Sequence, residues 1–409
     1  MKILLVNKFH YIKGGSETYY FGLAELLKSS GHEVIFFSMK DVRNFPCRQE
    51  KYFVDHVDFN APMSKRKMLQ AAWKMLYSRE AKNKFKQLLL DEKPDIIHLN
   101  IFQSQLTGSI VDVAKKFRIP LVYTAHDLKS ICPAYTMFNH GEVCERCLGG
   151  RYLNCVKQSC MKESRAKSLL ATMEAYSYKW RGTYRKIDHV ITPSHFYKYK
   201  LEESNVFDCK ITYIPNFLTD VDLVSRAEAG EYFLYFGRLS KEKGVLTAVQ
   251  AYAGLHTDRM FYIVGTGPIE DDVKSLVSEL GLEEKVKLLG FKQGDELKYI
   301  VANARCVILP SEWYENGPYS VMEALAAGTP AIVSSNGGLP ELVREGETGF
   351  ISEPQNADHL ALKMKIVDEL TEEELLRMSQ KCIDMAKEKF DKKTYYHELM
   401  RIYCSLLKE

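Results

Sequence analysis

The sequence predicts an α/β protein made of two doubly wound, Rossmann-like domains in series. Short apolar strands alternate with helices from residue 3 onward, and the alternation breaks at Pro215 and Asn216 before it starts again at residue 232. Such alternation builds parallel sheets with helices on both faces. The 409 residues, 46% hydrophobic and 27% charged, suffice for two cores of ordinary size.

We expect an N-terminal domain at 1–216, a C-terminal domain at 217–390, and a last helix at 391–409 that packs back on the N-terminal domain. Ligands of doubly wound sheets bind at the carboxyl ends of the strands. The two domains are therefore expected to face each other across a ligand-binding cleft.

The first domain opens with a strand at 3–6, a loop that contains Gly14 and Gly15, and a helix that Ser16 is expected to cap. The next strand is at 34–37. The later elements are a basic helix at 64–90, a strand at 95–99, a helix at 107–117, a strand at 121–124, a cysteine-rich insertion at 132–160, a basic helix at 162–184 and strands at 190–192 and 211–214.

The second domain follows a polar linker at 219–231. Its strands are predicted at 232–236, 261–264, 285–289, 306–309 and 331–334. Its helices are predicted from 245 and at 270–280, 294–302, 319–327, 356–369 and 371–389, and the last helix of the chain at 392–408.

Residues 310–338 carry the most informative local pattern. An apolar strand ends at Pro310, a loop follows, and a helix begins near Pro318 and closes at Gly328. Free N–H groups and the positive end of such a helix favour a phosphate. Two carboxylates, Glu315 and Glu323, accompany this predicted anion site, and one of them could accept both hydroxyls of a ribose.

The net charge of +3 hides an asymmetry between the halves of the chain. Residues 1–214 contain 34 basic and 21 acidic side chains, a net charge of +13, and the remainder carries −10. The basic half is expected to meet an anionic partner, for which nucleic acid, an anionic membrane face and a phosphorylated substrate all qualify. The sequence has no apolar run of membrane-spanning length and no signal-peptide pattern at its start, so we expect a cytoplasmic protein.

Five of the ten cysteines crowd into residues 132–160. In a reducing compartment such a cluster favours metal over disulfides. Cys144, Cys147, Cys155 and Cys160 have spacings that a structural zinc knuckle could use, with free or redox thiols as the alternative.

The two common nucleotide fingerprints fail. A dinucleotide site needs Gly-x-Gly-x-x-Gly directly after a strand, and the run that starts at Gly265 has Glu270 at the third glycine position. The chain has no Walker loop.

The motifs together resemble the retaining GT-B glycosyltransferases of the large Glu-x7-Glu family, which is family 4-like and called group 1, of the bacterial surface-polysaccharide type. They occur in the family's order over nearly the whole chain. They are Gly-Gly-Ser-Glu at 14–17, Thr-Ala-His-Asp at 124–127, Pro-Asn at 215–216, Phe-Gly-Arg-Leu-Ser-Lys-Glu-Lys-Gly at 236–244, Val-Gly-Thr-Gly-Pro at 264–268, and Glu315-x7-Glu323 with Gly-Gly-Leu-Pro-Glu at 337–341.

This resemblance implies a retaining hexosyltransferase that moves a sugar from a nucleotide-sugar donor to a saccharide acceptor. Arg238 and Lys243 would hold the donor diphosphate, Glu323 the ribose, and Glu315 the sugar hydroxyls, with His126 on the other side of the sugar. The implied catalytic residues are His126, Glu315, Arg238 and Lys243. The implied donor-binding residues are Gly14, Gly15, Gly237, Arg238, Lys243, Gly265, Glu315, Gly317, Tyr319, Ser320, Val321 and Glu323.

No catalytic metal or other cofactor is implied, since the two cations stabilise the leaving phosphate. UDP is favoured over GDP as the donor nucleotide. The acceptor is expected to be carried on a polyprenyl diphosphate. The basic stretch at 162–200 is expected to contact the anionic inner leaflet of the membrane, which would make the protein peripheral there.

One departure from the family concerns Gly317 and Pro318, where relatives commonly carry Phe-Gly. Pro318 has no N–H, so one donor to the sugar or phosphate is missing.

The alternative enzymes are a nucleotide-sugar epimerase and a GT-B phosphorylase. The non-enzymatic alternative is a zinc-knuckle nucleic-acid-binding protein, which would leave the phosphate loops unexplained.

Overall fold

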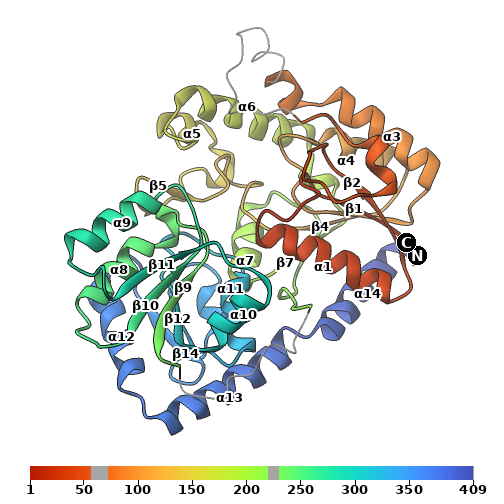
Figure 1. Ribbon diagram of the computed structural model, residues 1–409. Helices are drawn as coiled ribbons and strands as arrows, with labels where there is room; N and C mark the ends of the chain where they lie inside the picture. The colour runs from red at the N-terminus through yellow and green to blue at the C-terminus, as the bar shows by residue number, and fades with distance from the viewer. Residues whose placement is uncertain (57–71, 220–229, 409) are drawn as a thin grey trace. The chain divides into compact units, whose positions relative to one another are not determined.

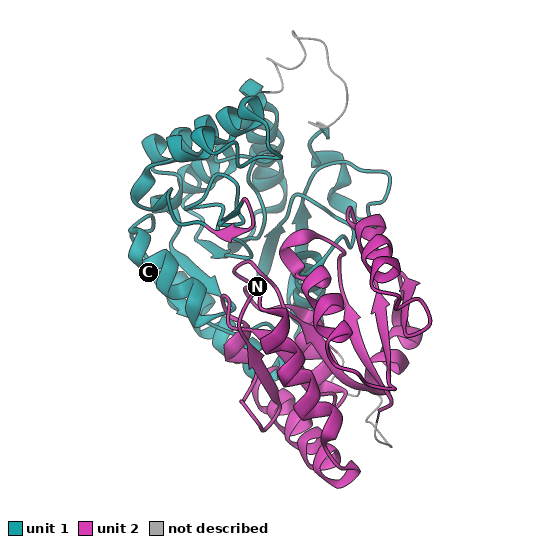
Figure 2. Cartoon of the chain, turned by 90° about the vertical axis from the view of Figure 1, so that its left-hand side faces the viewer, with its two compact units in different colours: residues 1–139, 144–216, 392–409 teal, residues 140–143, 217–391 magenta. Residues whose placement is uncertain are grey.

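The computed structural model of the protein describes residues 1–56, 72–219 and 230–408 and divides into two compact units (Figure 2). Unit 1 consists of Met1–Asn139, Cys144–Asn216 and Lys392–Glu409, and unit 2 of His140–Val143 and Phe217–Asp391. Each unit contains a six-stranded sheet whose neighbouring strands are parallel. The two doubly wound domains predicted from the sequence are therefore confirmed.

The sheet of unit 1 has the strand order β2-β1-β3-β4-β7-β8 (Figure 1). Because β1 lies between β2 and β3, the order reverses there, and the carboxyl ends of β1 and β3 form the edge where such sheets bind ligands. The strands are β1 (Lys2–Val6), β2 (Glu33–Phe37), β3 (Ile96–Leu99), β4 (Leu121–Thr124), β7 (His189–Thr192) and β8 (Lys210–Tyr213).

Most helices of unit 1 lie at predicted positions, with two local corrections. Ser16 does not cap the first helix: Gly14 is its N-cap residue, without a side-chain bond, and the Ser16 hydroxyl donates to Glu17 instead. Of the predicted helix at 64–90, residues 64–71 lie outside the described residues, and the rest is not one helix. The helical residues 72–76 end before Ser78, whose side chain caps a new helix that begins at Arg79. The helices are α1 (Gly15–Ser29), α3 (Arg79–Glu92), α4 (Ser109–Lys116), α5 (Leu153–Lys157), α6 (Arg165–Arg181), α7 (His195–Ser204) and α14 (Lys392–Lys408).

The C-terminal helix α14 belongs to unit 1 and packs beside α1. Buried hydroxyls join it to the sheet: the Tyr403 hydroxyl lies 2.6 Å from Nδ1 of His98 in β3, and Tyr395 hydrogen-bonds to Tyr19 in α1. Thr124 in β4 closes the group through its bonds with His98 and Tyr19. Polar groups buried this deeply fix the helix to one position, because each would cost free energy if left unpaired.

Unit 2 has the strand order β11-β10-β9-β12-β13-β14. Its strands are β9 (Tyr232–Phe236), β10 (Met260–Val264), β11 (Val286–Gly290), β12 (Ala304–Leu309), β13 (Ala331–Ser334) and β14 (Gly349–Ser352). Its helices are α8 (Val245–Ala253), α9 (Glu270–Glu279), α10 (Gly294–Ala302), α11 (Tyr319–Ala326), α12 (Ala357–Glu369) and α13 (Glu372–Lys389). The sequence analysis did not predict β14 or, in unit 1, α5 and α7.

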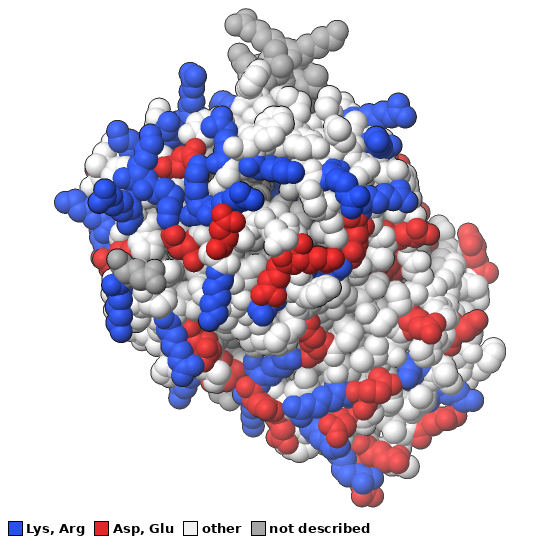
Figure 3. Space-filling model, turned by 180° about the vertical axis from the view of Figure 1, so that it is seen from behind, with Lys and Arg blue, Asp and Glu red and all other residues white. Residues whose placement is uncertain are grey.

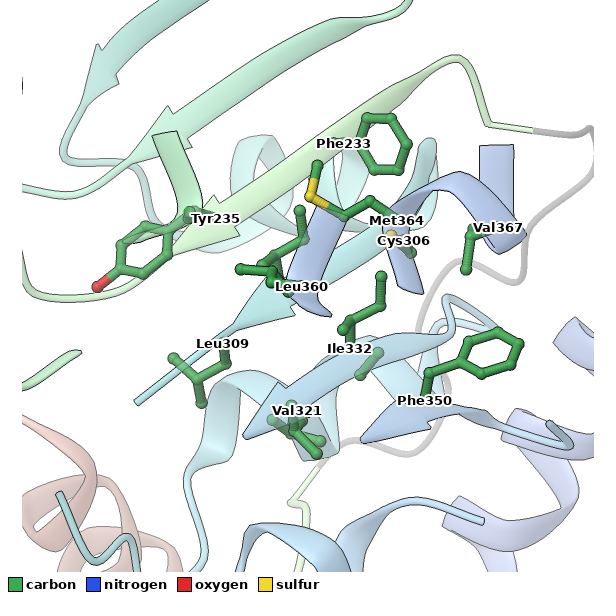
Figure 4. Close-up of a cluster of buried hydrophobic side chains, with 14 of the residues drawn as sticks. Phe233, Tyr235, Cys306, Leu309, Val321, Ile332, Phe350, Leu360, Met364 and Val367 are labelled. Carbon is green, nitrogen blue, oxygen red and sulfur yellow. The ribbon is translucent and has the colours of Figure 1, made fainter. Parts of the chain in front are cut away.

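The core of unit 2 is formed by alternate side chains of the strands and the helices on either face. Phe233 and Tyr235 of β9 point into one cluster with Leu360 and Met364 of α12 (Figure 4), whereas Leu234 and Phe236 belong to a second cluster. This alternation is the two-residue period of a strand buried on both faces. The loops at the carboxyl ends of β9 and β12 carry the predicted donor site.

None of the helices in the described part of the chain combines the length and the apolar character that a bilayer-spanning segment needs.

Candidate active site

The loops at the carboxyl edge of the unit 2 sheet are joined by backbone hydrogen bonds. The N–H of Gly237, after β9, donates to Val264 at 3.0 Å, and the N–H of Gly265, after β10, donates to Gly290 at 2.8 Å. Gly265 has φ +130°, and a Cβ there would lie 1.9 Å from the Gly237 carbonyl oxygen. Glycine is therefore required at 265 to let the two predicted donor-binding loops approach each other.

The two predicted cations follow β9. Arg238 is exposed, and in the described part of the chain no carboxylate forms an ion pair with it. Lys243 ends a short 3-10 turn (Lys241–Lys243) that closes at Gly244 with φ +69°. A Cβ on Gly244 would lie 2.1 Å from the Pro310 carbonyl oxygen, so this glycine lets the turn press against the end of β12.

That approach brings Lys243 to Glu315, whose side chain is 7% exposed. The Lys243 ammonium lies 2.5 Å from Glu315 Oε1. The same oxygen accepts from the Ser311 hydroxyl at 2.7 Å and from the Trp313 indole N–H at 2.8 Å. The Lys243 ammonium also lies 5.4 Å from the centre of the Trp313 ring. These contacts fix a charged pair at the strand end.

The sequence analysis did not predict that Ser311 and Trp313 would contact Glu315. Both lie within four residues of it, and both carry a donor that a buried carboxylate needs. A search of the loop for such donors would have found them.

Tyr319, Ser320 and Val321 form the first turn of α11, and Gly317 lies in the loop just before it. Pro318 is its N-cap residue with an extended backbone. The Val321 N–H donates to the Pro318 carbonyl at 3.2 Å, so this amide is already used inside the turn. The positive end of α11 still faces the carboxyl edge of the sheet, where a helix N-terminus favours an anion.

Glu323 lies one turn further along α11 and is half-buried. Burial raises the pKa of its carboxyl to about 7, and nearby Lys298 offsets only part of this rise. Among the described residues, no hydrogen bond or ion pair joins Glu323 or Arg238 to the Lys243–Glu315 pair. Glu323 is thus a carboxylate poised near neutrality that a hydrogen-bonding ligand would stabilise.

In unit 1, His126 follows β4. Its Nε2 lies 2.9 Å from Oδ1 of Asn100, which follows β3. The amide of Asn100 donates through Nδ2 to the Val6 carbonyl, so its oxygen is the group that faces His126. His126 therefore carries its proton on Nε2 and keeps a lone pair on Nδ1. Burial lowers the pKa of His126 to about 3, and the edge of the ring packs against Tyr19 at 4.7 Å between centres.

Gly14 and Gly15 lie exposed at the start of α1. Gly14 has φ −176°, and a Cβ there would meet no atom within 4 Å, so the backbone at this turn is open to a ligand. Among the described residues, His126 hydrogen-bonds to Asn100 and to neither glycine.

A buried polar group at the same edge of the unit 1 sheet was not predicted. Asn7, directly after β1, donates to the buried Glu17 at 3.2 Å and accepts from the Ile101 N–H at 3.1 Å. Burial raises the pKa of Glu17 and of Asp127, and lowers the pKa of Lys8. The positions of Asn7 and Lys8 after β1 and of Asp127 after β4 were the available signal, whereas Glu17 lies in the first turn of α1.

The cysteine cluster does not show the arrangement that a zinc site needs. Cys147 and Cys155 are buried, and Cys144 and Cys160 are half-buried. A hydrogen bond with Cys160 lowers the pKa of Cys155 to about 7 and raises the pKa of Cys160. Among the described residues, no three His, Cys, Asp or Glu side chains converge on a metal position. The thiols as they lie do not fit a metal ion, and the zinc site stays a prediction.

Comparison with known proteins identifies the family. A model described as Glycosyltransferase Family 4 matches residues 13–220, and one described as Glycosyl transferases group 1 matches residues 224–389. An uncharacterized glycosyltransferase of Methanocaldococcus jannaschii is 28% identical over 380 residues, which cover 88% of this chain and 87% of that protein.

Two further similarities have more informative names. The putative colanic acid biosynthesis glycosyltransferase WcaL of Escherichia coli is 28% identical over 177 residues, 41% of this chain and 44% of its own. Anabaena HepE, solved with UDP and with UDP-glucose, shares the fold with a TM-score of 0.70 in the UDP complex, at 18% identity over 99% of this chain and 100% of its own. The fold is therefore GT-B, and the family favours sugar transfer over the nucleic-acid-binding alternative. The chain belongs to glycosyltransferase family 4, with a C-terminal half of the group 1 type.

Proposed function

We propose that this glycosyltransferase is a retaining hexosyltransferase that uses a UDP-sugar to extend a saccharide in polysaccharide or glycolipid biosynthesis. The UDP and UDP-glucose complexes of Anabaena HepE support the donor. The name of the colanic acid relative supports the saccharide product.

The observation that carries the proposal is the fixed Lys243–Glu315 pair at the mouth of the unit 2 loops. A diphosphate leaving group gains negative charge as its bond to the sugar breaks. Lys243, held in place before the donor arrives, and the exposed Arg238 supply two cations for that charge. The positive end of α11 adds to them.

The two carboxylates then have separate roles. Oε1 of Glu315 takes three donors from the protein, so its second oxygen is the one to bind hydroxyls of the donor sugar. Glu323, with its raised pKa, binds both ribose hydroxyls as a carboxylate. His126, in unit 1, accepts a hydrogen bond from the transferred sugar at its Nδ1.

The proposed step replaces one bond at the anomeric carbon with another on the same face. The bond from the anomeric carbon to the UDP oxygen breaks, and that oxygen keeps the electron pair. The acceptor hydroxyl oxygen forms the new bond, and its proton passes to the leaving phosphate. No protein base is needed in this step, and Lys243 and Arg238 stabilise the departing charge.

The proposed acceptor is a saccharide on a polyprenyl diphosphate at the anionic inner face of the membrane, where the protein would be peripheral. The basic N-terminal half supports this. On the face shown in Figure 3, Lys and Arg side chains crowd the part formed by unit 1, whereas both signs mix over unit 2. Attraction of basic surfaces to anionic lipids is a general electrostatic effect.

A panel of UDP- and GDP-sugars tests the donor and the reaction. We expect slow hydrolysis of one UDP-hexose without acceptor and faster turnover with a lipid-linked saccharide. Proton NMR of the first product should show the donor's anomeric configuration. An isomerised nucleotide sugar without acceptor would indicate the epimerase, and phosphate-dependent release of a sugar phosphate would indicate the phosphorylase.

A further inference from the structure

Helix α6 carries an apolar stripe, which we define as Leu169, Met173, Tyr176 and Trp180. Their spacing of four, three and four residues places them along one face of the helix. Leu169 is 49% exposed, Met173 44% and Trp180 81%. Tyr176 is half-buried and stacks on Trp180, with ring centres 5.5 Å apart. A contiguous exposed apolar patch of this kind marks an interaction surface.

The opposite face of α6 is firmly anchored, so the stripe is a presented surface. Ser168, Ala171, Thr172 and Tyr178 are buried. Thr172 donates its hydroxyl to the Tyr152 carbonyl at 3.2 Å, just before α5, which packs along α6 (Figure 1). The Ser164 side chain caps the helix at its start.

The surface around the stripe is strongly basic. Residues 146–186 contain ten Lys and Arg against two acidic residues. One of the two, Glu174, is buried in an ion pair with Lys129 at 3.0 Å, so it adds nothing to the surface charge. The exposed cations of this segment are Arg146, Arg151, Lys157, Lys162, Arg165, Lys167, Lys179, Arg181 and Arg185.

A cavity of about 410 Å³ opens beside the C-terminal end of the stripe. Lys179, Trp180 and Arg185 line it together with Tyr184. Gly150 has φ +79°, and the Lys179 ammonium lies where a Cβ would be, so the backbone and the cation meet closely at the rim. Two cations beside aromatic rings suit a phosphate carried on an apolar group.

We propose that the stripe and its surrounding cations are the surface by which this enzyme docks on an anionic lipid bilayer, with a lipid phosphate in the cavity. The apolar side chains enter the boundary between headgroups and acyl chains, while the cations contact the headgroups. Trp180 has the amphipathic ring that is enriched at this depth. A polyanion such as RNA would use the cations but leave Leu169 and Met173 exposed, so the bilayer fits better.

This inference deepens the proposed lipid-linked reaction and rests on it for its biological meaning. Its test uses the full-length protein and co-sedimentation with vesicles of phosphatidylcholine, alone or with 30% phosphatidylglycerol. We expect binding only to the anionic vesicles. Leu169→Glu with Met173→Glu should weaken that binding at least 10-fold. The matched control is Leu362→Glu with Ile366→Glu, an exposed apolar pair at the same spacing on α12 of unit 2.

Vesicle co-sedimentation also tests the cations around the stripe and the cavity beside it. Arg165→Glu with Lys167→Glu should reduce binding at least 10-fold, and Arg377→Glu with Lys381→Glu, exposed on α13, should not. Lys179→Ala with Arg185→Ala should weaken binding several-fold. Displacement of the protein by millimolar glycerol phosphate would assign the cavity to a soluble phosphate and overturn that part of the proposal.

Vesicles with brominated lipids measure how deeply Trp180 enters the bilayer. They should quench the tryptophan fluorescence of the wild-type protein and of Trp73→Phe. The quenching should be mostly absent in Trp180→Phe. Equal vesicle binding by the stripe variant and the wild type would overturn the docking surface.

Donor hydrolysis without vesicles separates the two proposals: a variant that hydrolyses donor normally but fails to bind vesicles supports the docking surface. Vesicle binding by a protein that hydrolyses no nucleotide sugar would leave the surface standing and remove the proposed function.

Discussion

The Lys243 ammonium and the Glu315 carboxylate lie 2.5 Å apart, and the same carboxylate oxygen accepts from Ser311 and Trp313. A cation held this way needs no reorganisation when charge develops on a leaving phosphate. We therefore expect Lys243→Ala to reduce kcat by roughly 10²–10³-fold, because that is the usual effect of removing one fixed electrostatic group. Donor affinity, measured by calorimetry, should fall far less than turnover.

The matched control for this prediction is Lys241→Ala, which removes an exposed cation from the same turn. It should leave kcat within about twofold, since a solvated charge contributes little. An unchanged kcat in Lys243→Ala would refute the role given to this residue.

Glu323→Gln tests the half-buried carboxyl with a pKa near 7. The folded pKa lies above the ordinary value of 4.5, so the native state holds this proton more tightly than the unfolded chain. Without donor, its contribution to stability is therefore present below pH 4.5 and is lost as pH rises through 7, by up to about 3 kcal/mol. The glutamine variant should melt several degrees higher than the wild type at pH 8 and equally at pH 4.5.

Donor binding should show the opposite effect of the same substitution. A carboxylate accepts from both ribose hydroxyls, whereas an amide has one oxygen, so UDP affinity should fall about 10- to 100-fold. Wild-type affinity should rise with pH through 7, and the variant's should not. Glu279→Gln, at an exposed position in α9, is the control. Tight, pH-independent UDP binding by Glu323→Gln would contradict the ribose role.

Tyr403→Phe tests how α14 is held to unit 1. The hydroxyl of this buried tyrosine bonds to His98 Nδ1 at 2.6 Å. Its removal leaves a buried ring nitrogen unpaired, which should cost about 1–3 kcal/mol of unfolding free energy in urea. Tyr396→Phe is the control, because the hydrogen bond of Tyr396 with His32 is only half-buried. This variant should lose less unfolding free energy than Tyr403→Phe. Equal losses in the two variants would mean that the buried network does not hold the helix.

The sequence predicted the elements and site positions that depend on local chemistry. The strand before Pro310, the helix after Pro318 and the strand at 331–334 are marked by proline, glycine and apolar runs, and the structure has all three. The strand β14 was not predicted because it is four residues long and begins at Gly349, three residues after Gly346, and two glycines so close together resemble a turn. The helix α7 has a Ser194 cap but a polar sequence with a weak period.

The contacts that define the candidate site could not be predicted from local sequence patterns, because they join residues far apart in the chain. Asn100 and His126 are 26 residues apart and meet only because β3 and β4 are neighbours in the sheet. His98 and Tyr403 are 305 residues apart, and their contact depends on where the last helix packs. Burial, which raises the pKa of Glu323 and lowers that of His126, likewise depends on the whole unit.

Asn100→Asp tests the tautomer of His126. The Asn100 oxygen accepts from Nε2 at 2.9 Å, which fixes the tautomer with its lone pair on Nδ1, while burial keeps the imidazole neutral. A carboxylate at 100 would favour the doubly protonated ring and raise the pKa of His126 from about 3 toward neutrality. With donor saturating, kcat of the variant should therefore fall as pH drops from 7 to 5, while the wild type shows no such fall.

Asn100→Ala should lose about tenfold in kcat without this fall at acidic pH, because the ring is no longer oriented but stays neutral. Asn303→Asp, at a half-buried asparagine of unit 2, should follow the wild type. If the profile of Asn100→Asp superimposes on that of the wild type, Asn100 does not set the protonation of His126, and the hydrogen bond only packs the two strand ends together.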